Sequence, residues 1–143
     1  MTLQFQDPYV DHLAALNTDI NPYTLELRRD AQNPAGLTKY GPALRDLRGR
    51  WREHFQQAGI ACERLVLEIG CHRGDVLLQM AEDHPDWAFV GMDITLKRVA
   101  LTARKAAHAG RHNVRTVLSN AKQLDYIFAP DEIDGVVIFF PDP

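Results

Sequence analysis

The strongest fold signal in this chain is Leu65-Val66-Leu67-Glu68-Ile69-Gly70-Cys71-His72-Arg73-Gly74-Asp75-Val76-Leu77-Leu78. Residues 65–69 are apolar except for one acid, as expected for a strand that is buried on both faces. Gly70 and Gly74 permit a tight turn and let a ligand approach the backbone closely. The apolar spacing that follows suits a helix. A strand, a glycine turn and a helix together favour a small-molecule site, above all a nucleoside-cofactor site, at the carboxyl end of a parallel strand.

Strand and helix patterns alternate from residue 61 to the end of the sequence. Strands are expected at 65–69, 87–92, 114–118 and 135–140; helices are expected at 75–84 and 96–109, with a short helix or turn at 122–128. This alternation predicts an α/β protein with a mostly parallel sheet and helices on both faces, a Rossmann-like fold. We therefore assign residues 61–143 to one cofactor-binding domain.

Residues 1–60 are expected to form an N-terminal arm followed by a helix. Residues 1 to about 40 carry several turn signals, such as Asn21-Pro22, and no clear apolar period. From Pro42 to about Gln57, a helix is predicted with a core-facing stripe of Leu44, Leu47, Trp51 and Phe55. The arginines mostly off this stripe fit either a solvated face or a contact with phosphates; they include Arg45, Arg48 and Arg52.

The composition is that of an ordinary globular domain. With 143 residues, 45% of them hydrophobic, the chain is long enough for one domain with its own core. Its net charge of -3 gives no overall basic signature of nucleic-acid binding, although a local basic patch is compatible with that value. Cys62 and Cys71 have no metal-ligand spacing, so we expect neither a metal site nor a disulfide framework.

Nothing in the sequence predicts contact with a membrane. No apolar run approaches the roughly 20 residues that span a bilayer. The N-terminus also lacks the basic start and apolar stretch of a signal peptide. We therefore expect a cytoplasmic protein.

Polar residues follow the predicted strands, where parallel sheets bind their ligands. Glu68 ends the first strand, Asp93 follows the second, Asn120 follows the third and Asp142 follows the fourth. An acid after the second strand can accept hydrogen bonds from ribose hydroxyls, and an amide after the third can bond an adenine edge. Taken singly, Asp93 and Asn120 also fit as helix or turn caps. Occurring in this order, they predict a nucleoside-cofactor site.

The residues of the glycine turn indicate which nucleoside cofactor, S-adenosylmethionine or NAD, the predicted site would bind. Dinucleotide-binding folds carry G-x-G-x-x-G after the first strand, whereas the turn here is Gly70-Cys71-His72-Arg73-Gly74 with an acid before it. A phosphate loop ending in Gly-Lys-Ser/Thr is also absent from the sequence. The pattern therefore favours S-adenosylmethionine over NAD.

Five segments resemble the tRNA (guanine-N7-)-methyltransferases, a family of class I S-adenosylmethionine-dependent enzymes. They are Leu67-Glu68-Ile69-Gly70, Val90-Gly91-Met92-Asp93-Ile94, Asn113-Val114-Arg115, Ser119-Asn120-Ala121 and the most specific one, Phe139-Phe140-Pro141-Asp142-Pro143. The resemblance implies methylation of guanine N7 in tRNA with S-adenosylmethionine as cofactor. It implies that the cofactor is bound by Glu68, Gly70, Gly74, Asp93 and Asn120. It also implies that Asp142 is the catalytic acid and binds the target guanine.

Two features depart from that family. The family usually has glycine where this chain has His72, and that position is expected to need a positive φ. Family members also continue beyond the point that corresponds to Pro143, so the chain resembles a truncated enzyme whose C-terminal strands are missing. We expect a homodimer, a partner subunit or missing residues of a longer chain to cover the exposed sheet edge. Two alternatives stay open: a methyltransferase of the same fold with another substrate, and an inactive scaffold.

Overall fold

The computed structural model describes residues 7–14 and 21–139 of the chain, and the statements below refer to these residues. The elements in chain order are α1 (Pro22–Gln32), β1 (Thr38–Lys39), α2 (Pro42–Leu47), α3 (Trp51–Gln57), β2 (Leu65–Ile69), α4 (Asp75–Asp83), β3 (Ala88–Asp93), α5 (Leu96–His108), β4 (Val114–Leu118), the 3-10 turn η1 (Ala121–Gln123), α6 (Leu124–Ile127) and β5 (Gly135–Val137). No helix among them is long and apolar enough to cross a bilayer.

The five strands form one parallel sheet in the order β1-β4-β3-β2-β5. From β2 the chain passes to β3 and β4, and it then returns to add β5 on the other side of β2. The strand order therefore reverses at β2, which is where doubly wound sheets bind ligands. The predicted parallel α/β fold is confirmed.

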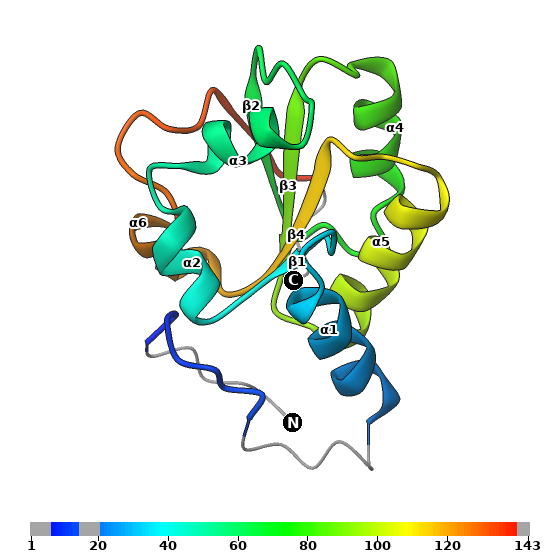
Figure 1. The fold of residues 1–143 in the computed structure, drawn as a ribbon, viewed down its shortest axis with the longest axis vertical. Helices are drawn as coiled ribbons and strands as arrows, with labels where there is room; N and C mark the ends of the chain where they lie inside the picture. The colour runs from blue at the N-terminus through cyan, green and yellow to red at the C-terminus, as the bar shows by residue number, and fades with distance from the viewer. Residues whose placement is uncertain (1–6, 15–20, 140–143) are drawn as a thin grey trace.

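Helices cover both faces of the sheet, because alternate strand residues point to opposite sides (Figure 1). One face packs Leu65 and Leu67 of β2 against α2, α3 and α6, with Trp51 and Phe55 fully buried there. The other face packs Val66 against α4 and α5. Burial on both sides explains why the β2 sequence is a continuous apolar run rather than an alternating one.

The N-terminal part is more regular than the expected arm. Helix α1 lies on α5, where the Glu26 carboxylate accepts two hydrogen bonds from the Arg104 guanidinium (2.6 and 2.8 Å). Strand β1 extends the sheet by pairing Thr38 with Thr116 of β4. A two-residue strand has no period of its own to detect, so only its pairing with β4 makes it a strand.

The helix expected from Pro42 to about Gln57 is divided in two, because Gly49 adopts a left-handed conformation (φ 78°) between α2 and α3. The arginines whose role was left open contact the protein itself. Arg45 lies over the Tyr9 ring (4.8 Å to its centroid), Arg48 donates to the Asp125 carbonyl (2.9 Å) and Arg52 pairs with the Asp134 carboxylate (2.7 Å). These contacts hold α2 and α3 to distant parts of the chain.

Candidate functional site

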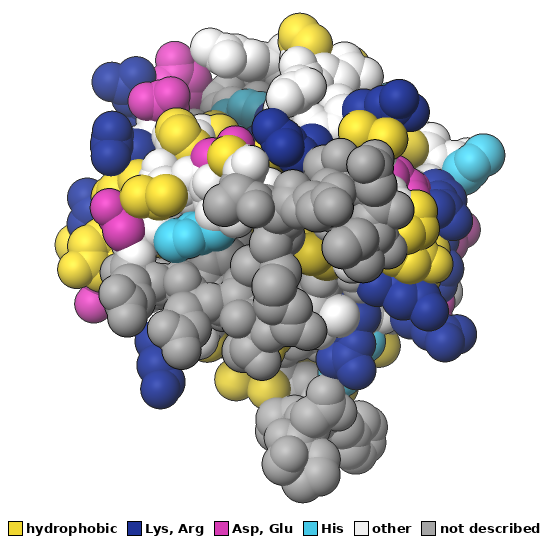
Figure 2. Space-filling model, turned by 90° about the horizontal axis from the view of Figure 1, so that it is seen from below, with side chains coloured by type: hydrophobic (Ala, Val, Ile, Leu, Met, Phe, Trp, Pro, Cys, Tyr) yellow, Lys and Arg dark blue, Asp and Glu magenta, His cyan; other side chains and the backbone are white. Residues whose placement is uncertain are grey.

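A cavity of about 400 Å³ lies at the carboxyl ends of β2, β3 and β4, next to the residues that follow β5. Figure 2 looks onto the end of the molecule where the strands finish, with Lys and Arg side chains spread around its rim. The cavity is lined by Ile69, Gly70, His72, Met92, Asp93, Ile94, Thr95, Arg98, Ser119, Asn120, Ala121 and Ile138. Its volume and its mixture of apolar walls with a few polar groups suit a small-molecule ligand.

Asp93 is the buried acid of this cavity, with only 5% of its surface exposed. Its Oδ1 accepts the backbone N–H of Thr95 (3.0 Å) and its Oδ2 accepts the backbone N–H of His72 (3.2 Å). The Arg98 guanidinium lies 3.8 Å from Oδ2. Asp93 is not the helix cap that its sequence position also suggested, because the N-cap of α5 is Thr95; instead it accepts the N–H of that residue and faces the cavity.

The glycine turn, residues 70–74, is held from two sides. The N–H groups of Gly70 and Cys71 both donate to the Met92 carbonyl of β3 (2.8 and 3.0 Å). From α5, the Thr102 hydroxyl donates to the carbonyl of His72 (3.1 Å). These bonds fix the turn between two neighbouring strands and one helix, so a ligand in the cavity meets a rigid backbone rather than a flexible loop.

Gly74 is required for packing. It has φ 81°, and a Cβ added there would lie 2.5 Å from Cγ2 of Thr102. Gly74 and the first residue of α4 are not among the lining residues, so α5 rather than the cavity accounts for the absence of a side chain at position 74. Gly70 (φ 73°) lines the cavity itself.

His72 has φ 52°, which confirms that its position requires a left-handed backbone. It is half-buried and lines the cavity beside Gly70. The left-handed conformation is maintained because the N–H and the carbonyl of His72 itself are bonded to Asp93 and Thr102. A histidine in this conformation is strained by roughly 1 kcal/mol relative to glycine.

The end of β4 contributes two polar side chains to the cavity. Asn120 accepts the backbone N–H of Lys122 through Oδ1 (2.9 Å), so it caps η1 and leaves its amide N–H groups for other partners. Ser119 is 1% exposed, and its Oγ has no hydrogen-bond partner among the described residues. A buried hydroxyl without a partner at a cavity wall is the arrangement that a polar ligand atom would complete.

Glu68 lies on the face of the sheet that packs against α4 and α5, and it is not among the cavity residues. It is 3% exposed, and its Oε1 has no hydrogen-bond partner within the described part of the chain. Burial raises the pKa of Glu68 to about 7. A buried carboxyl whose Oε1 lacks a partner, in an interior strand of the sheet, is costly, which indicates that it serves a purpose other than stability.

Of the predicted site residues, the structure brings Gly70, Asp93 and Asn120 to one cavity; Asp142 lies outside the described residues. Sequence reasoning missed Arg98, although its position in the first turn of the helix that follows Asp93 could have indicated it. It also missed Ile138, which reaches the cavity only because β5 pairs with β2. Among the described residues no group of three or more His, Cys, Asp and Glu could hold a metal ion.

A doubly wound parallel sheet with an acid and a glycine turn at its switch point defines a Rossmann-like ligand-binding domain. Comparison with known families makes the class specific. Residues 63–143 match a family model whose description is "Putative methyltransferase". The match covers more than half of the chain, so the chain belongs to this methyltransferase family, and the methyltransferase class predicted from the sequence is confirmed.

Curated relatives extend the similarity. The chain is 34% identical over 98 residues to a tRNA (guanine-N(7)-)-methyltransferase of Christiangramia forsetii, covering 68% of this chain and 42% of the relative. It is 31% identical over 135 residues to the enzyme of the same name from Cutibacterium acnes, covering 94% of this chain and 45% of the relative. The chain thus spans less than half the length of these relatives.

Solved structures support the fold. A 16S rRNA (adenine(1408)-N(1))-methyltransferase from Catenulisporales acidiphilia superposes with a TM-score of 0.51 at 23% identity, over 64% of this chain and 43% of that one. At this level the similarity concerns the arrangement of strands and helices alone.

Proposed function

We propose that this chain forms the S-adenosylmethionine-binding part of a methyltransferase that produces 7-methylguanosine in tRNA. The observation that carries the proposal is the cavity at the carboxyl ends of β2, β3 and β4, with buried Asp93 in its wall. The substrate is suggested by relatives named tRNA (guanine-N(7)-)-methyltransferase, one of which matches 94% of this chain. The terminal Phe139-Phe140-Pro141-Asp142-Pro143 segment agrees with that name.

The cavity residues fit the cofactor in shape and in polarity. Each carboxylate oxygen of Asp93 accepts one N–H and retains lone pairs for the ribose hydroxyls. Asn120 would donate its free amide N–H groups to the adenine edge, and Ser119 would supply its unpartnered hydroxyl. Apolar contact with the adenine ring would come from Ile69, Met92, Ile94 and Ile138.

The three remaining predicted positions have different roles in this proposal. The bare backbone of Gly70 would lie against the cofactor, whereas Gly74 would act by allowing the turn to pack on Thr102. Glu68 would receive the ammonium group of the amino-acid part, because that charge is what an unpartnered buried carboxyl lacks.

The bound cofactor would supply an electrophilic methyl group on a sulfonium. Guanine N7 would accept that methyl group with its own lone pair, and the electron pair of the carbon–sulfur bond would stay on sulfur. No general base is needed, so the protein has to align the nucleophile with the methyl group and exclude water. We assign Asp142 to the stabilisation of the cationic product guanine, on the strength of its sequence motif.

We further propose that the outer edge of β5 is covered by further polypeptide, which is another copy of the chain, a separate subunit, or the remainder of a longer chain. Val136 and Ile138 are each 54% exposed, and among the described residues no strand pairs with the outer edge of β5. An exposed apolar edge strand is a pairing surface.

We also propose that the protein acts in the cytoplasm. A tRNA substrate and two free, buried cysteines are consistent with a reducing compartment.

Two measurements test the function in order. Calorimetric titration with S-adenosylhomocysteine should show binding that Asp93→Ala weakens at least tenfold. Incubation with S-adenosylmethionine and an unmodified tRNA transcript should then yield 7-methylguanosine in the nuclease digest. Binding without any methylated nucleoside would favour another substrate. No binding at millimolar ligand would overturn the proposal in favour of an inactive scaffold.

A further inference from the structure

A second cavity, of about 310 Å³, shares no lining residue with the first. It lies between α3, the residues before β1 and the turn that leads into β4. Its wall consists of Pro34, Ala35, Leu37, His54, Gln57, Ala58, His112 and Arg115. Arg115, in β4, lines this second cavity, and Ser119, which directly follows β4, lines the first one. The two residues are four positions apart, so the cavities are separated by about 13 Å along the strand.

The floor of this cavity holds Arg115, which is only 6% exposed. Its Nη1 donates to the carbonyls of His112 and Val114 (both 2.8 Å), and its Nε donates to Nε2 of His54 (2.9 Å). Its guanidinium lies 4.9 Å from the centre of the Phe55 ring. Nη2 makes no hydrogen bond among the described residues, so two N–H donors of a buried cation remain for a ligand.

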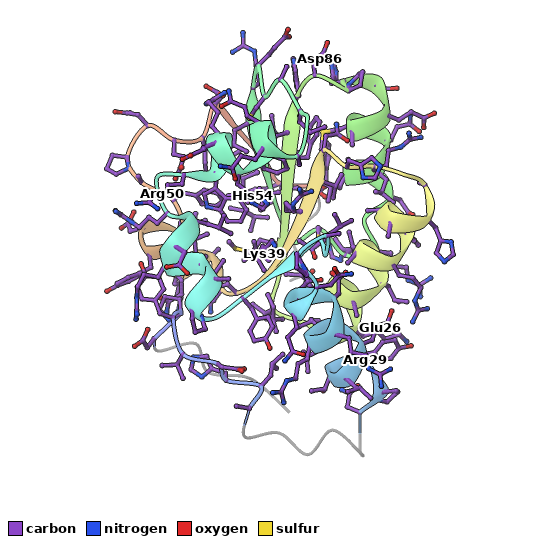
Figure 3. The ribbon with its side chains drawn as sticks, in the orientation of Figure 1. Glu26, Arg29, Lys39, Arg50, His54 and Asp86 are labelled. Carbon is purple, nitrogen blue, oxygen red and sulfur yellow. The ribbon has the colours of Figure 1, made fainter. Side chains whose placement is uncertain are left out.

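Lys39 adds a second positive charge on the same face of the sheet. Thr38 and Thr116 are paired and share a hydrogen bond between their hydroxyls (3.3 Å), so both point to one side. The alternation of strand residues then places Lys39 and Arg115 together on the other side, toward α3. In Figure 3, Lys39 and His54 are labelled close to each other in front of β4.

The charges of this cluster are not balanced. Burial and the charge of Arg115 lower the pKa of Lys39, and burial lowers the pKa of Arg115 itself to about 10. The pKa of His54 falls to about 4, because it is buried beside Arg115 and Lys39. Among the described residues, the acid that offsets Arg115 and Lys39 is Asp30, whose Oδ2 already accepts the backbone N–H groups of Leu37 and Thr38 (3.1 and 2.7 Å).

Neither Arg115 nor Lys39 forms an ion pair with a carboxylate within residues 7–14 and 21–139. A buried guanidinium is normally paired, since an isolated charge is strongly disfavoured in a protein interior. We propose that the cavity lined by Arg115, His54 and His112 binds a phosphate group, with Nη2 of Arg115 as its main donor and Lys39 as the supporting charge.

Phosphate is the anion that this arrangement suits. With Nε and Nη1 already bonded, the two N–H groups of Nη2 remain as donors to the strong acceptor oxygens of a phosphate group. The half-buried His54 and the exposed His112 and Gln57 add polar groups at the wall and the rim. The volume exceeds that of a phosphate ion, so the rest of a nucleotide or of a small phosphorylated molecule fits as well. The phosphate could be that of a free small molecule or one in an RNA chain.

The test uses a substitution at the rim that leaves the Arg115 contacts intact. Ala58 is exposed, lines the cavity and follows the last turn of α3, so Ala58→Glu would place a carboxylate at the mouth of the site. Ala58→Gln is the matched control, because it has the same size without the charge. Inorganic phosphate is titrated at low ionic strength and followed by calorimetry and by NMR shifts of backbone amides.

Saturable binding should appear with the unmodified chain and with Ala58→Gln, and it should weaken at least tenfold with Ala58→Glu. Lys39→Met should weaken it severalfold without disturbing the Arg115 contacts. Asp93→Ala, in the other cavity, should leave it unchanged, which keeps this result independent of the proposed methyl transfer. Absence of saturable binding at 50 mM phosphate, or equal affinity of the two position-58 variants, would overturn the proposal.

Two further probes identify the source of the phosphate. Adenosine monophosphate represents a free small molecule, and a short RNA without terminal phosphates represents the backbone of a nucleic acid. If Ala58→Glu weakens only the binding of adenosine monophosphate and inorganic phosphate, the ligand is a small molecule. If Ala58→Glu also weakens the binding of the RNA, and the affinity for RNA then depends less steeply on salt concentration, the site holds a backbone phosphate.

Discussion

The backbone N–H of His72 donates a hydrogen bond to Oδ2 of Asp93 (3.2 Å), which joins the turn after β2 to the end of β3. The same histidine has φ 52° and offers its carbonyl to Thr102. A strained residue is therefore held between an acid of the cavity and a helix of the core. Strain that the surroundings maintain is typical of ligand sites, and it connects the stability of the domain with ligand binding.

Asp93→Asn should weaken the binding of S-adenosylhomocysteine at least tenfold. The amide keeps one acceptor oxygen, so it can satisfy Thr95 or His72 but not both, and it loses the charge that strengthens bonds to ribose hydroxyls. Loss of a hydrogen bond to a charged group corresponds to about 1.5–3 kcal/mol. Calorimetry measures the change, and Asp86→Asn, at an exposed position outside the cavity, is the control. Equal weakening by both variants would contradict this role for Asp93.

Glu68→Gln should stabilise the ligand-free chain at alkaline pH and have little effect near pH 4. Because burial raises the folded pKa of Glu68 from 4.5 to about 7, the folded state binds its proton more tightly than the unfolded state. The contribution of protonated Glu68 to the stability of the folded state is complete below pH 4.5 and is lost as pH rises through 7. The relative loss above pH 8 is on the order of 3 kcal/mol.

Urea unfolding of both proteins at pH 4.5, 6, 7 and 8.5 gives the free energies of unfolding that this comparison needs. The control is Glu63→Gln, since Glu63 is exposed and lies just before β2. It makes the same change of glutamate to glutamine at a side chain that is not buried. If the free energies of unfolding of Glu68→Gln and of the unmodified chain change with pH in the same way over this range, burial does not raise the pKa of Glu68 in the folded chain.

Gly74→Ala should lower the free energy of unfolding by about 2–4 kcal/mol, because the new methyl group meets Thr102 at 2.5 Å and φ is 81°. Gly110→Ala is the matched control: it also has positive φ (68°), but nothing lies within 4 Å of its added Cβ. Gly110→Ala should lower the free energy of unfolding by about 1–2 kcal/mol.

Thr102→Ser should rescue part of the loss in Gly74→Ala, because it removes the clashing Cγ2 and keeps the hydroxyl that donates to His72. A double-mutant cycle measured by thermal or urea unfolding gives the coupling energy. Strictly additive effects would show that the Gly74–Thr102 contact does not limit the substitution.

His72→Val should destabilise the chain by about 1–2 kcal/mol, since a β-branched residue tolerates a left-handed backbone poorly. His72→Gly should leave the stability unchanged or slightly higher, because relief of strain offsets the greater freedom of glycine in the unfolded chain. His108→Val, in the exposed last turn of α5, is the control and should change the stability by less than about 0.5 kcal/mol. Equal stability of the valine and glycine variants at position 72 would contradict the strain at this position.

Long apolar patterns made much of the fold predictable. Residues 65–69 and 114–118 are strands with the expected bounds, because each is a short segment rich in aliphatic and β-branched residues and is followed by a turn signal. Strand β3 ends one residue later than expected, at Asp93, because that residue still pairs with Leu118 of β4. β1 escaped prediction, since its two residues become a strand only through hydrogen bonds to β4.

The candidate site was predictable to the extent that strand ends carry it. Gly70, Asp93 and Asn120 follow or end strands, and in a parallel sheet all such residues meet at one edge. Burial of Glu68 away from the cavity lining could not be foreseen, because a side chain's face depends on which helices cover each side of the sheet.

The sequence by itself determined the fold class and the glycine turn, because hydrophobic period and turn chemistry are local properties of the chain, and its motifs resembled those of the methyltransferase family. Tertiary structure alone decided that Ser119 has no hydrogen-bond partner among the described residues, that Gly74 is required by Thr102, and that Arg115 and Lys39 lie together with no ion-paired carboxylate in residues 7–14 and 21–139. These relationships join residues that are distant in sequence. They arise only when strands take their order in the sheet and helices exclude water from one of its faces.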